Sequence, residues 1–283
     1  MFCSLKFCKK KRRDKIMKKI ETLLDQFGTT MSYRQLVAEL EDADETTRAT
    51  VLVAVAQKQA DFWAESAEYY QEAHPRLPGM KAHNKWVLKA VDAIPGDRVL
   101  DIGCGCGRFA PMFHRGIQYM GVDPSAAMFE IARREHTGDN IHFLQWPDNT
   151  KLPFGDGYFD IVLANWSIVY MEPNKLQATL FDLRRVIRPG GRFVLTAIVA
   201  NARWGWLATV RSTFSNPLET WRQRDAIRQA IPFGRSIGLL FPSYMEWELD
   251  GLVTQAGLRI VATQHTLWGR SYGIVAKRLS QPP

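Results

Sequence analysis

A glycine-rich loop after a short apolar run carries the clearest chemistry in the sequence. Val99-Leu100-Asp101-Ile102 leads into three alternate glycines, Gly103, Gly105 and Gly107. Glycine lets the backbone turn tightly, and a ligand can approach it without meeting a Cβ atom. The N–H groups at a helix start also favour an acceptor or an anion. Residues 99–109 therefore predict a strand, a ligand-binding turn and the start of a helix.

Two acids limit the kind of ligand that this loop can hold. Asp123 ends the next apolar run, 22 residues after Asp101, and an acid there is placed to bind both hydroxyls of a ribose. The stretch Gly105–Ala110 matches the dinucleotide pattern G-x-G-x-x-A, but that register ends the strand two residues early. Asp101 would repel a pyrophosphate and attract a cationic amino-acid group. It therefore favours a nucleoside that carries an amino acid, with an NAD-binding dehydrogenase as the remote alternative.

Asp101 and the three glycines resemble the first motif of the class I S-adenosylmethionine-dependent methyltransferases, acid-x-Gly-x-Gly-x-Gly. The resemblance covers residues 95–200 well and residues 243–277 more loosely. It continues through Leu152-Pro153-Phe154, a motif that most resembles the corresponding one in the branch that methylates small molecules, including quinones, lipids and natural products. Further matches are Asp156–Val162 at the entry to a fourth strand and Leu183–Gly191 at the entry to a fifth. The resemblance implies methyl transfer to an O, N or C atom of a small molecule.

The resemblance also implies a cofactor and the residues that bind it. S-adenosylmethionine is the expected cofactor, with its ribose on Asp123. Asp148 is expected near the adenine amino group, and Asn149 is expected to supply a neighbouring N–H. Asn165 follows the fourth strand, where the transferred methyl group is expected. The other implied cofactor-binding residues are Tyr70, Asp101, Gly103, Gly105 and Gly107.

An aromatic stripe precedes the loop. Trp63, Ala67 and Tyr70 are spaced i, i+4 and i+7, so a helix would place them on one face, and His74 continues that face. Similar proteins carry W-x-x-x-A-x-x-Y on a cap helix whose tyrosine meets the carboxylate end of the cofactor. The resemblance therefore implies a cofactor contact for Tyr70, and His74 becomes a candidate catalytic or substrate-binding residue. Alternatively, the stripe only docks the helix on the sheet.

The expected reaction needs little acid–base chemistry. A sulfonium is already an activated methyl donor, so the enzyme must align the acceptor, the methyl group and the sulfur, and exclude water. A general base is required only when the acceptor holds its proton at neutral pH. No residue pattern in the sequence identifies such a base. Tyr170 is the second candidate catalytic residue, through a hydrogen bond to the substrate, unless it is a core aromatic.

Two segments are candidates for binding the methyl acceptor. Trp166 lies in Asn165-Trp166-Ser167-Ile168, which departs from the Asn/Asp-Pro-Pro-aromatic motif of DNA amino-methylating members and disfavours that reaction. Residues 201–242 are rich in arginine and tryptophan, and Arg222 and Arg224 suit bidentate capture of a carboxylate or a phosphate. We expect an aromatic or amphipathic acceptor that bears an acidic group. The alternative is that these arginines lie on an exposed helix.

The middle of the chain alternates apolar runs with amphipathic stretches. Strands are predicted at 98–102, 117–122, 141–145, 159–164 and 192–200, and helices near 107–115, 125–136 and 174–188. This alternation predicts an α/β fold with a Rossmann-like, mostly parallel sheet covered by helices on both faces. The resemblance implies seven strands, the last of them antiparallel. After a helix over 243–256, the remaining strands are expected at 258–266 and 272–276.

The chain is expected to divide into a basic tail, a helical N-terminal cap and a methyltransferase domain. Their predicted bounds are 1–16, 17–94 and 95–283, and residues 201–242 are expected to be an irregular insertion that closes over the substrate. Within the cap, one helix should end at Gly28 and a second should be capped by Ser32. Longer helices are predicted over 46–72 and 79–93.

The net charge of +8 arises in the tail, because nine basic residues and one acid lie in the first 20 positions. The remainder is neutral, so the folded body shows no field that would attract nucleic acid. The tail is a solvated arm, or precedes a true start at Met17, or binds RNA or anionic lipid.

With 46% hydrophobic residues the composition is globular. No apolar run reaches the ~20 residues that cross a bilayer, and no secretory signal is recognisable.

The cysteines indicate a reducing, cytoplasmic location and no metal site. Cys104 and Cys106 form a C-x-C pair that lacks two further ligands, so both are expected to be small buried side chains. An RNA methyltransferase that uses the basic tail remains an alternative, as does a non-catalytic relative that binds a partner protein. Intact acids at Asp101, Asp123 and Asp148 argue against the second alternative. The acceptor and the oligomeric state are left open.

Overall fold

The computed structural model describes residues 17–147, 151–199, 223–267 and 271–280. These residues form two compact units. The first unit contains residues 17–62 together with 232–242, and the second contains the other described residues.

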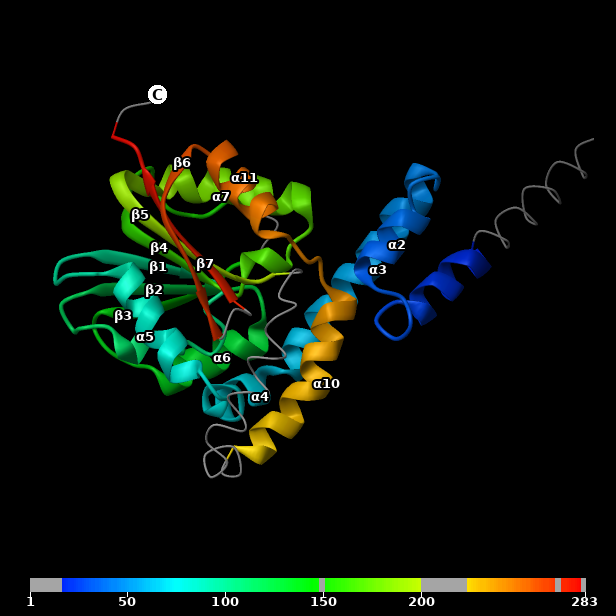
Figure 1. The fold of residues 1–283 in the computed structure, drawn as a ribbon, viewed down its shortest axis with the longest axis horizontal. Coiled ribbons are helices and arrows are strands. Elements are labelled where there is room, and N and C mark those ends of the chain that lie inside the picture. The colour runs from blue at the N-terminus through cyan, green and yellow to red at the C-terminus, as the bar shows by residue number, and fades with distance from the viewer. Residues whose placement is uncertain (1–16, 148–150, 200–222, 268–270, 281–283) are drawn as a thin grey trace, which may run out of the picture. The chain divides into compact units, whose positions relative to one another are not determined.

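The second unit is built on one sheet of seven strands (Figure 1). In the order in which they lie side by side, the strands are β3 (Ile141–Gln145), β2 (Gln118–Asp123), β1 (Arg98–Ile102), β4 (Phe159–Asn165), β5 (Ile187–Ile198), β7 (Ser271–Arg278) and β6 (Leu258–Thr266). Strands β1 to β5 pair in parallel, and β7 is antiparallel to both β5 and β6. The predicted α/β fold with seven strands, the last of them antiparallel, is confirmed.

The two central strands, β1 and β4, are buried on both sides. Leu100 and Val162 belong to one buried layer, whereas their neighbours Val99 and Ile161 belong to the other. A strand buried on both faces is mostly apolar, and the inner residues of these two strands are apolar except for Asp101. The strand order also reverses between β1 and β4. Ligands of open α/β sheets bind at the carboxyl ends of the strands beside such a reversal.

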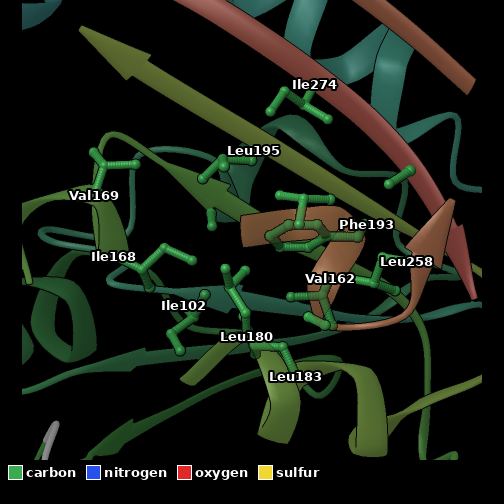
Figure 2. Close-up of a cluster of buried hydrophobic side chains, with 14 of the residues drawn as sticks. Ile102, Val162, Ile168, Val169, Leu180, Leu183, Phe193, Leu195, Leu258 and Ile274 are labelled. Carbon is green, nitrogen blue, oxygen red and sulfur yellow. The ribbon is translucent and has the colours of Figure 1, made fainter. Parts of the chain in front are cut away.

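One layer of the core lies between the sheet and two helices, α7 (Pro173–Val186) and α11 (Glu246–Gln255). Figure 2 shows Leu180 and Leu183 of α7 among the side chains of Val162 and Phe193 from β4 and β5. All four are fully buried. Burial of this apolar area is the main force that holds the helices on the sheet.

The opposite layer is covered by α5 (Met80–Val91), whose Val87 and Val91 are fully buried beside Val99 and Ile161. Helix α6 (Ala126–Glu135) begins after Ser125, whose hydroxyl accepts a hydrogen bond from the Met128 N–H at 3.4 Å. Together with α7 and α11, these helices confirm the prediction that both faces of the sheet are covered.

The first unit is helical. A helix over 17–26 ends before Gly28, which has φ 80°, as predicted. Ser32 caps α2 (Tyr33–Glu39) in a capping box with Gln35, which confirms the predicted cap. Helix α3 (Glu45–Glu65) begins in this unit, and its Lys58 ammonium donates to the carbonyl groups of Leu24 and Phe27. Residues 232–242 contribute Phe233 and Phe241, whose rings pack on Phe62 at 5.2 and 5.6 Å.

The helix predicted over 107–115 is wrong. The structure has only a 3-10 turn there, Ala110–Met112, after a series of tight turns. Pro111 provides the physical reason, because its ring would clash with the carbonyl of Gly107 in an α-helix and it has no N–H to donate. Gly107 itself has φ 75°, which no right-handed helix contains.

Two further helices differ from the prediction. The stretch 46–72 is not continuous, since α3 ends at Glu65 and α4 (Ala67–Glu72) begins after a break at Ser66. Residues predicted to be irregular include α10 (Arg224–Leu240), which contains Pro232. Among the described residues, no helix is long and apolar enough to cross a bilayer.

Candidate functional site

The predicted glycine loop lies at the carboxyl end of β1, beside the reversal of strand order. Gly103, Gly105 and Gly107 have φ values of 68°, 56° and 75°, in the left-handed region that favours glycine. Gly103 has a second requirement, because a Cβ atom there would overlap the Ser167 side chain. The Ser167 hydroxyl in turn donates to the Ile102 carbonyl at 2.6 Å. The loop is therefore packed closely against the residues that follow β4.

Asp123 joins the glycine loop to the start of α6. One carboxylate oxygen accepts from the Gly105 N–H at 2.8 Å, and the other accepts from the Ser125 N–H at 2.9 Å. The residue is only 7% exposed. Each carboxylate oxygen can accept more than one hydrogen bond, so these two bonds do not by themselves exhaust its capacity as an acceptor.

Asp101 is almost completely buried beneath the loop. It is 1% exposed, and the Tyr119 hydroxyl donates to its Oδ2 atom at 2.7 Å. Burial raises the pKa of Asp101 to about 7, although the Tyr119 hydrogen bond and the Arg108 charge both act in the opposite direction. A cation placed beside Asp101 would therefore stabilise the ionised form of a carboxyl group that is poised between its two states.

An aromatic cluster joins the predicted stripe to the residues after β4. Tyr70 of α4 stacks on His74 at 4.5 Å between ring centroids. His74 meets the edge of Trp166 at 5.6 Å, and Trp63 lies 5.3 Å from Tyr170. The two groups of candidates are about 100 residues apart in the chain, and the structure brings them together.

The end of β4 is held by a network of buried polar groups. Thr196 donates its hydroxyl hydrogen to Asn165 Oδ1 at 2.9 Å, and His83 Nε2 lies 2.8 Å from the same oxygen. His83 Nδ1 lies 2.8 Å from the Thr266 hydroxyl. The His83 ring also stacks on Trp166 at 4.1 Å. The sequence analysis missed His83, since a single histidine in a helix carries no signal of this role.

Trp166 has an unusual backbone conformation at this position. Its φ is 50°, which is rare for a large side chain and is found where the surrounding structure enforces it. The indole N–H donates to the Ser271 hydroxyl at 2.9 Å, and the residue is 7% exposed. Trp166 therefore presents a fixed ring to His74 and His83.

Arg108 is a second residue that the sequence analysis missed. Its guanidinium carbon lies 4.8 Å from the Phe109 ring and 5.5 Å from the Trp166 ring. Burial lowers the pKa of Arg108 to about 10, so the side chain stays charged at neutral pH. It forms no ion pair with any residue in the described ranges. The only sequence signal is its position directly after Gly107.

The candidate catalytic side chains are both electrically neutral at pH 7. Burial lowers the pKa of His74 to about 3 and that of His83 to about 4. Burial also raises the pKa of Tyr170 above its ordinary range. The Nδ1 atom of His74 is buried and has no hydrogen-bond partner among the described residues. His74 and Tyr170 therefore offer hydrogen bonds at neutral pH and are weak bases.

The remaining candidates are partly outside the described residues. Asp148, Asn149 and Arg222 lie outside them. Arg224 is the first residue of α10, where its side chain is 45% exposed and its Nε atom is 3.9 Å from the Asp225 carboxylate.

The cysteines of the loop are free thiols. The Cys106 thiol lies 3.3 Å from the Met128 sulfur and 3.5 Å from the Ala67 carbonyl, and Cys104 is partly buried. In the described part of the chain, no group of three or more His, Cys, Asp or Glu side chains is arranged to hold a metal ion.

Comparison with protein families adds independent information about this site. A family model described as a methyltransferase domain matches residues 99–191, which include the glycine loop and both acids. Malonyl-[acyl-carrier protein] O-methyltransferase from Enterobacter lignolyticus is 28% identical over 217 residues, covering 72% of this chain and 83% of that protein. Demethylmenaquinone methyltransferase from Renibacterium salmoninarum is 34% identical over 110 residues, covering 38% and 44%.

Solved structures share the fold at low sequence identity. A putative methyltransferase in complex with the Haloferax volcanii Trm112 activator has a TM-score of 0.57 and 19% identity, covering 78% of this chain and 96% of that one. Geranyl diphosphate C-methyltransferase from Streptomyces coelicolor, solved with S-adenosylhomocysteine, has a TM-score of 0.51 and 17% identity, covering 71% and 76%.

Proposed function

This chain is a class I S-adenosylmethionine-dependent methyltransferase, and on that basis we propose that it methylates an O, N or C atom of a small molecule. The observation that carries the proposal is the juxtaposition of Asp101, three left-handed glycines and Asp123 at the reversal of strand order. The names of two relatives support a small acceptor, since one acts on malonyl-[acyl-carrier protein] and the other on demethylmenaquinone.

The described residues fit S-adenosylmethionine. The glycine loop is a cradle in which a Cβ atom at Gly103 would have no room. We assign the ribose hydroxyls to Asp123 and the cofactor ammonium to the buried Asp101, with Tyr70 near the amino-acid end. When bound, the cofactor supplies a methyl group that is already activated on a sulfonium. Asp148 and Asn149 keep their proposed place at the adenine.

The residues around the methyl position would orient the acceptor and exclude water. Trp166 and Tyr170 form part of an aromatic wall, and His74 and Tyr170 can hydrogen-bond the acceptor. A histidine whose pKa is about 3 removes protons poorly at pH 7. This favours an acceptor atom that reacts without the help of a strong base, such as a carboxylate oxygen.

The proposed cap, lid and tail are separate elements of this hypothesis. Residues 17–94 would cap the site, and residues 201–242 would close over the acceptor. Neutralising Arg222 and Arg224 together should then raise KM for an acidic acceptor. An RNA substrate would instead require residues 1–16, and salt-dependent RNA binding that is lost on their deletion would favour it. The free thiols of Cys104 and Cys106 support a cytoplasmic location.

Calorimetric titration with S-adenosylmethionine, S-adenosylhomocysteine and NAD tests the proposed cofactor site. We expect micromolar binding of the first two ligands by the native protein and its loss in Asp123→Ala. Asp139→Ala, at an exposed position, is the matched control that should bind normally. Binding of NAD alone, or of no ligand, would contradict the proposal.

A further inference from the structure

Two buried polar atoms without partners point to one place in the site. In the described part of the chain, four buried side-chain nitrogen or oxygen atoms have no hydrogen-bond partner, and they include Arg108 Nη1 and His74 Nδ1. The two residues share a neighbour, since the Arg108 guanidinium carbon lies 5.5 Å and the His74 ring 5.6 Å from the centre of a Trp166 ring. The Arg108 charge also lowers the pKa of His74, which is consistent with their proximity.

Arg108 is partly buried, and its buried Nη1 atom has neither a hydrogen-bond partner nor an ion pair among the described residues, although the nearby charge of Asp101 raises its pKa. Buried charges in proteins are normally paired, because removing an isolated ion from water is expensive. The acid nearest in the sequence, Asp101, already accepts the Tyr119 hydroxyl and forms no ion pair with Arg108. The aromatic rings of Phe109 and Trp166 provide only weak compensation for the lost hydration. A ligand that brings a negative charge would supply the missing partner.

We propose that Arg108 and His74 form a carboxylate-binding site beside Trp166. The planar guanidinium can bind both oxygens of a carboxylate, and His74 can donate a further hydrogen bond from Nδ1. This inference rests on the proposed function, which offers two sources of a carboxylate. One source is the methionine part of the cofactor, and the other is an acidic group on the acceptor.

Arg108→Met is the variant that tests the site, because it removes the charge and keeps an apolar chain of similar length. Arg108→Lys keeps the charge without the planar fork and serves if the methionine variant does not fold. Arg133→Met is the matched control, since the Arg133 guanidinium also lies over a ring, 5.9 Å from Phe129, but is exposed and paired with Glu130. It should behave as the native protein does.

The ligands distinguish the two sources of the carboxylate. If the cofactor supplies it, native protein should bind S-adenosylhomocysteine about 10- to 100-fold more tightly than its decarboxylated analogue, which keeps the ammonium. Arg108→Met should remove that difference. If the acceptor supplies it, Arg108→Met should bind both adenosyl ligands normally. It should then fail to bind malonyl-N-acetylcysteamine, a free carboxylate on a thioester, when saturated with S-adenosylhomocysteine.

Thermal melting separates a binding role from a structural one. If Arg108 is paired with an anion only when a ligand is bound, the Arg108→Met variant should have a higher Tm than the native protein without ligand. The same variant should bind the ligand more weakly. The proposal is overturned if neither the cofactor carboxylate nor the malonyl probe depends on Arg108, whatever the Tm. Failure of the native protein to bind S-adenosylhomocysteine would instead contradict the proposed function.

Discussion

The hydroxyl of Tyr119 donates a hydrogen bond of 2.7 Å to the carboxylate of Asp101 on the neighbouring strand. Both side chains are almost fully buried. The bond favours the ionised carboxylate, while burial favours the protonated one and prevails, so the pKa of Asp101 rises to about 7. The acid assigned to the cofactor ammonium therefore changes its charge within the physiological range.

We predict that affinity for S-adenosylhomocysteine rises with pH through about 7. Only ionised Asp101 can pair with the ammonium, so affinity should fall by up to about tenfold per pH unit below the pKa. Tyr119→Phe removes a bond to the carboxylate and should move the midpoint to higher pH. Titrations from pH 5.5 to 8.5 measure both effects. 5′-Methylthioadenosine, which has no ammonium, is the control; a flat profile for S-adenosylhomocysteine would remove Asp101 from this role.

A second prediction concerns the effect of Asp101 on stability. Its folded pKa lies above the unfolded value, so the stability that protonated Asp101 provides is lost as the pH rises through about 7. Asp101→Asn can still accept from Tyr119 and has no charge to bury. The free energy of unfolding of Asp101→Asn minus that of the native protein should therefore increase by about 2 kcal/mol between pH 5 and pH 8. Urea denaturation at the two pH values measures this gain, and a constant difference would show that Asp101 stays ionised.

His83 should produce the opposite dependence on pH. Its folded pKa of about 4 lies below the unfolded value, so its contribution is present above pH 6.5 and is lost as the pH falls towards 4. The native protein should lose about 2 to 3 kcal/mol from this group over that range. His83→Gln should be less stable at pH 7.5, where Asn165 and Trp166 lose a partner, but should lose less on acidification. Denaturation curves at pH 7.5 and 5 compare the two proteins.

Gly103→Ala should be the most damaging single change in the loop. The new Cβ atom would overlap the Ser167 side chain at a φ of 68°. We expect a loss of about 1 to 3 kcal/mol in the free energy of unfolding and weaker cofactor binding. Gly155→Ala is the control, because no atom lies within 4 Å of a Cβ there. If the two variants bind the cofactor equally well and unfold at the same temperature, the close approach at Gly103 matters neither for stability nor for cofactor binding.

The sequence predicted the sheet well because strand patterns and turn residues are local. Strands at 98–102, 141–145 and 258–266 were predicted with the bounds that the structure has. The first two are short runs of mainly apolar residues, and the third follows the helix stop at Gly257, so neighbouring positions alone define each of them. The helix predicted over 107–115 is wrong, because Pro111 limits this segment to the 3-10 turn Ala110–Met112.

What the sequence determined by itself is therefore the glycine loop, its acids and the positions of the strands along the chain, because residues that act together there lie within a few positions of a strand end. Only the tertiary structure decided that Trp166 meets His74 and His83 and that the Nη1 atom of Arg108 is buried without a partner among the described residues. The physical reason is that burial and pairing depend on packing between segments that lie far apart in the chain. Residue spacing within one segment carries no record of such contacts.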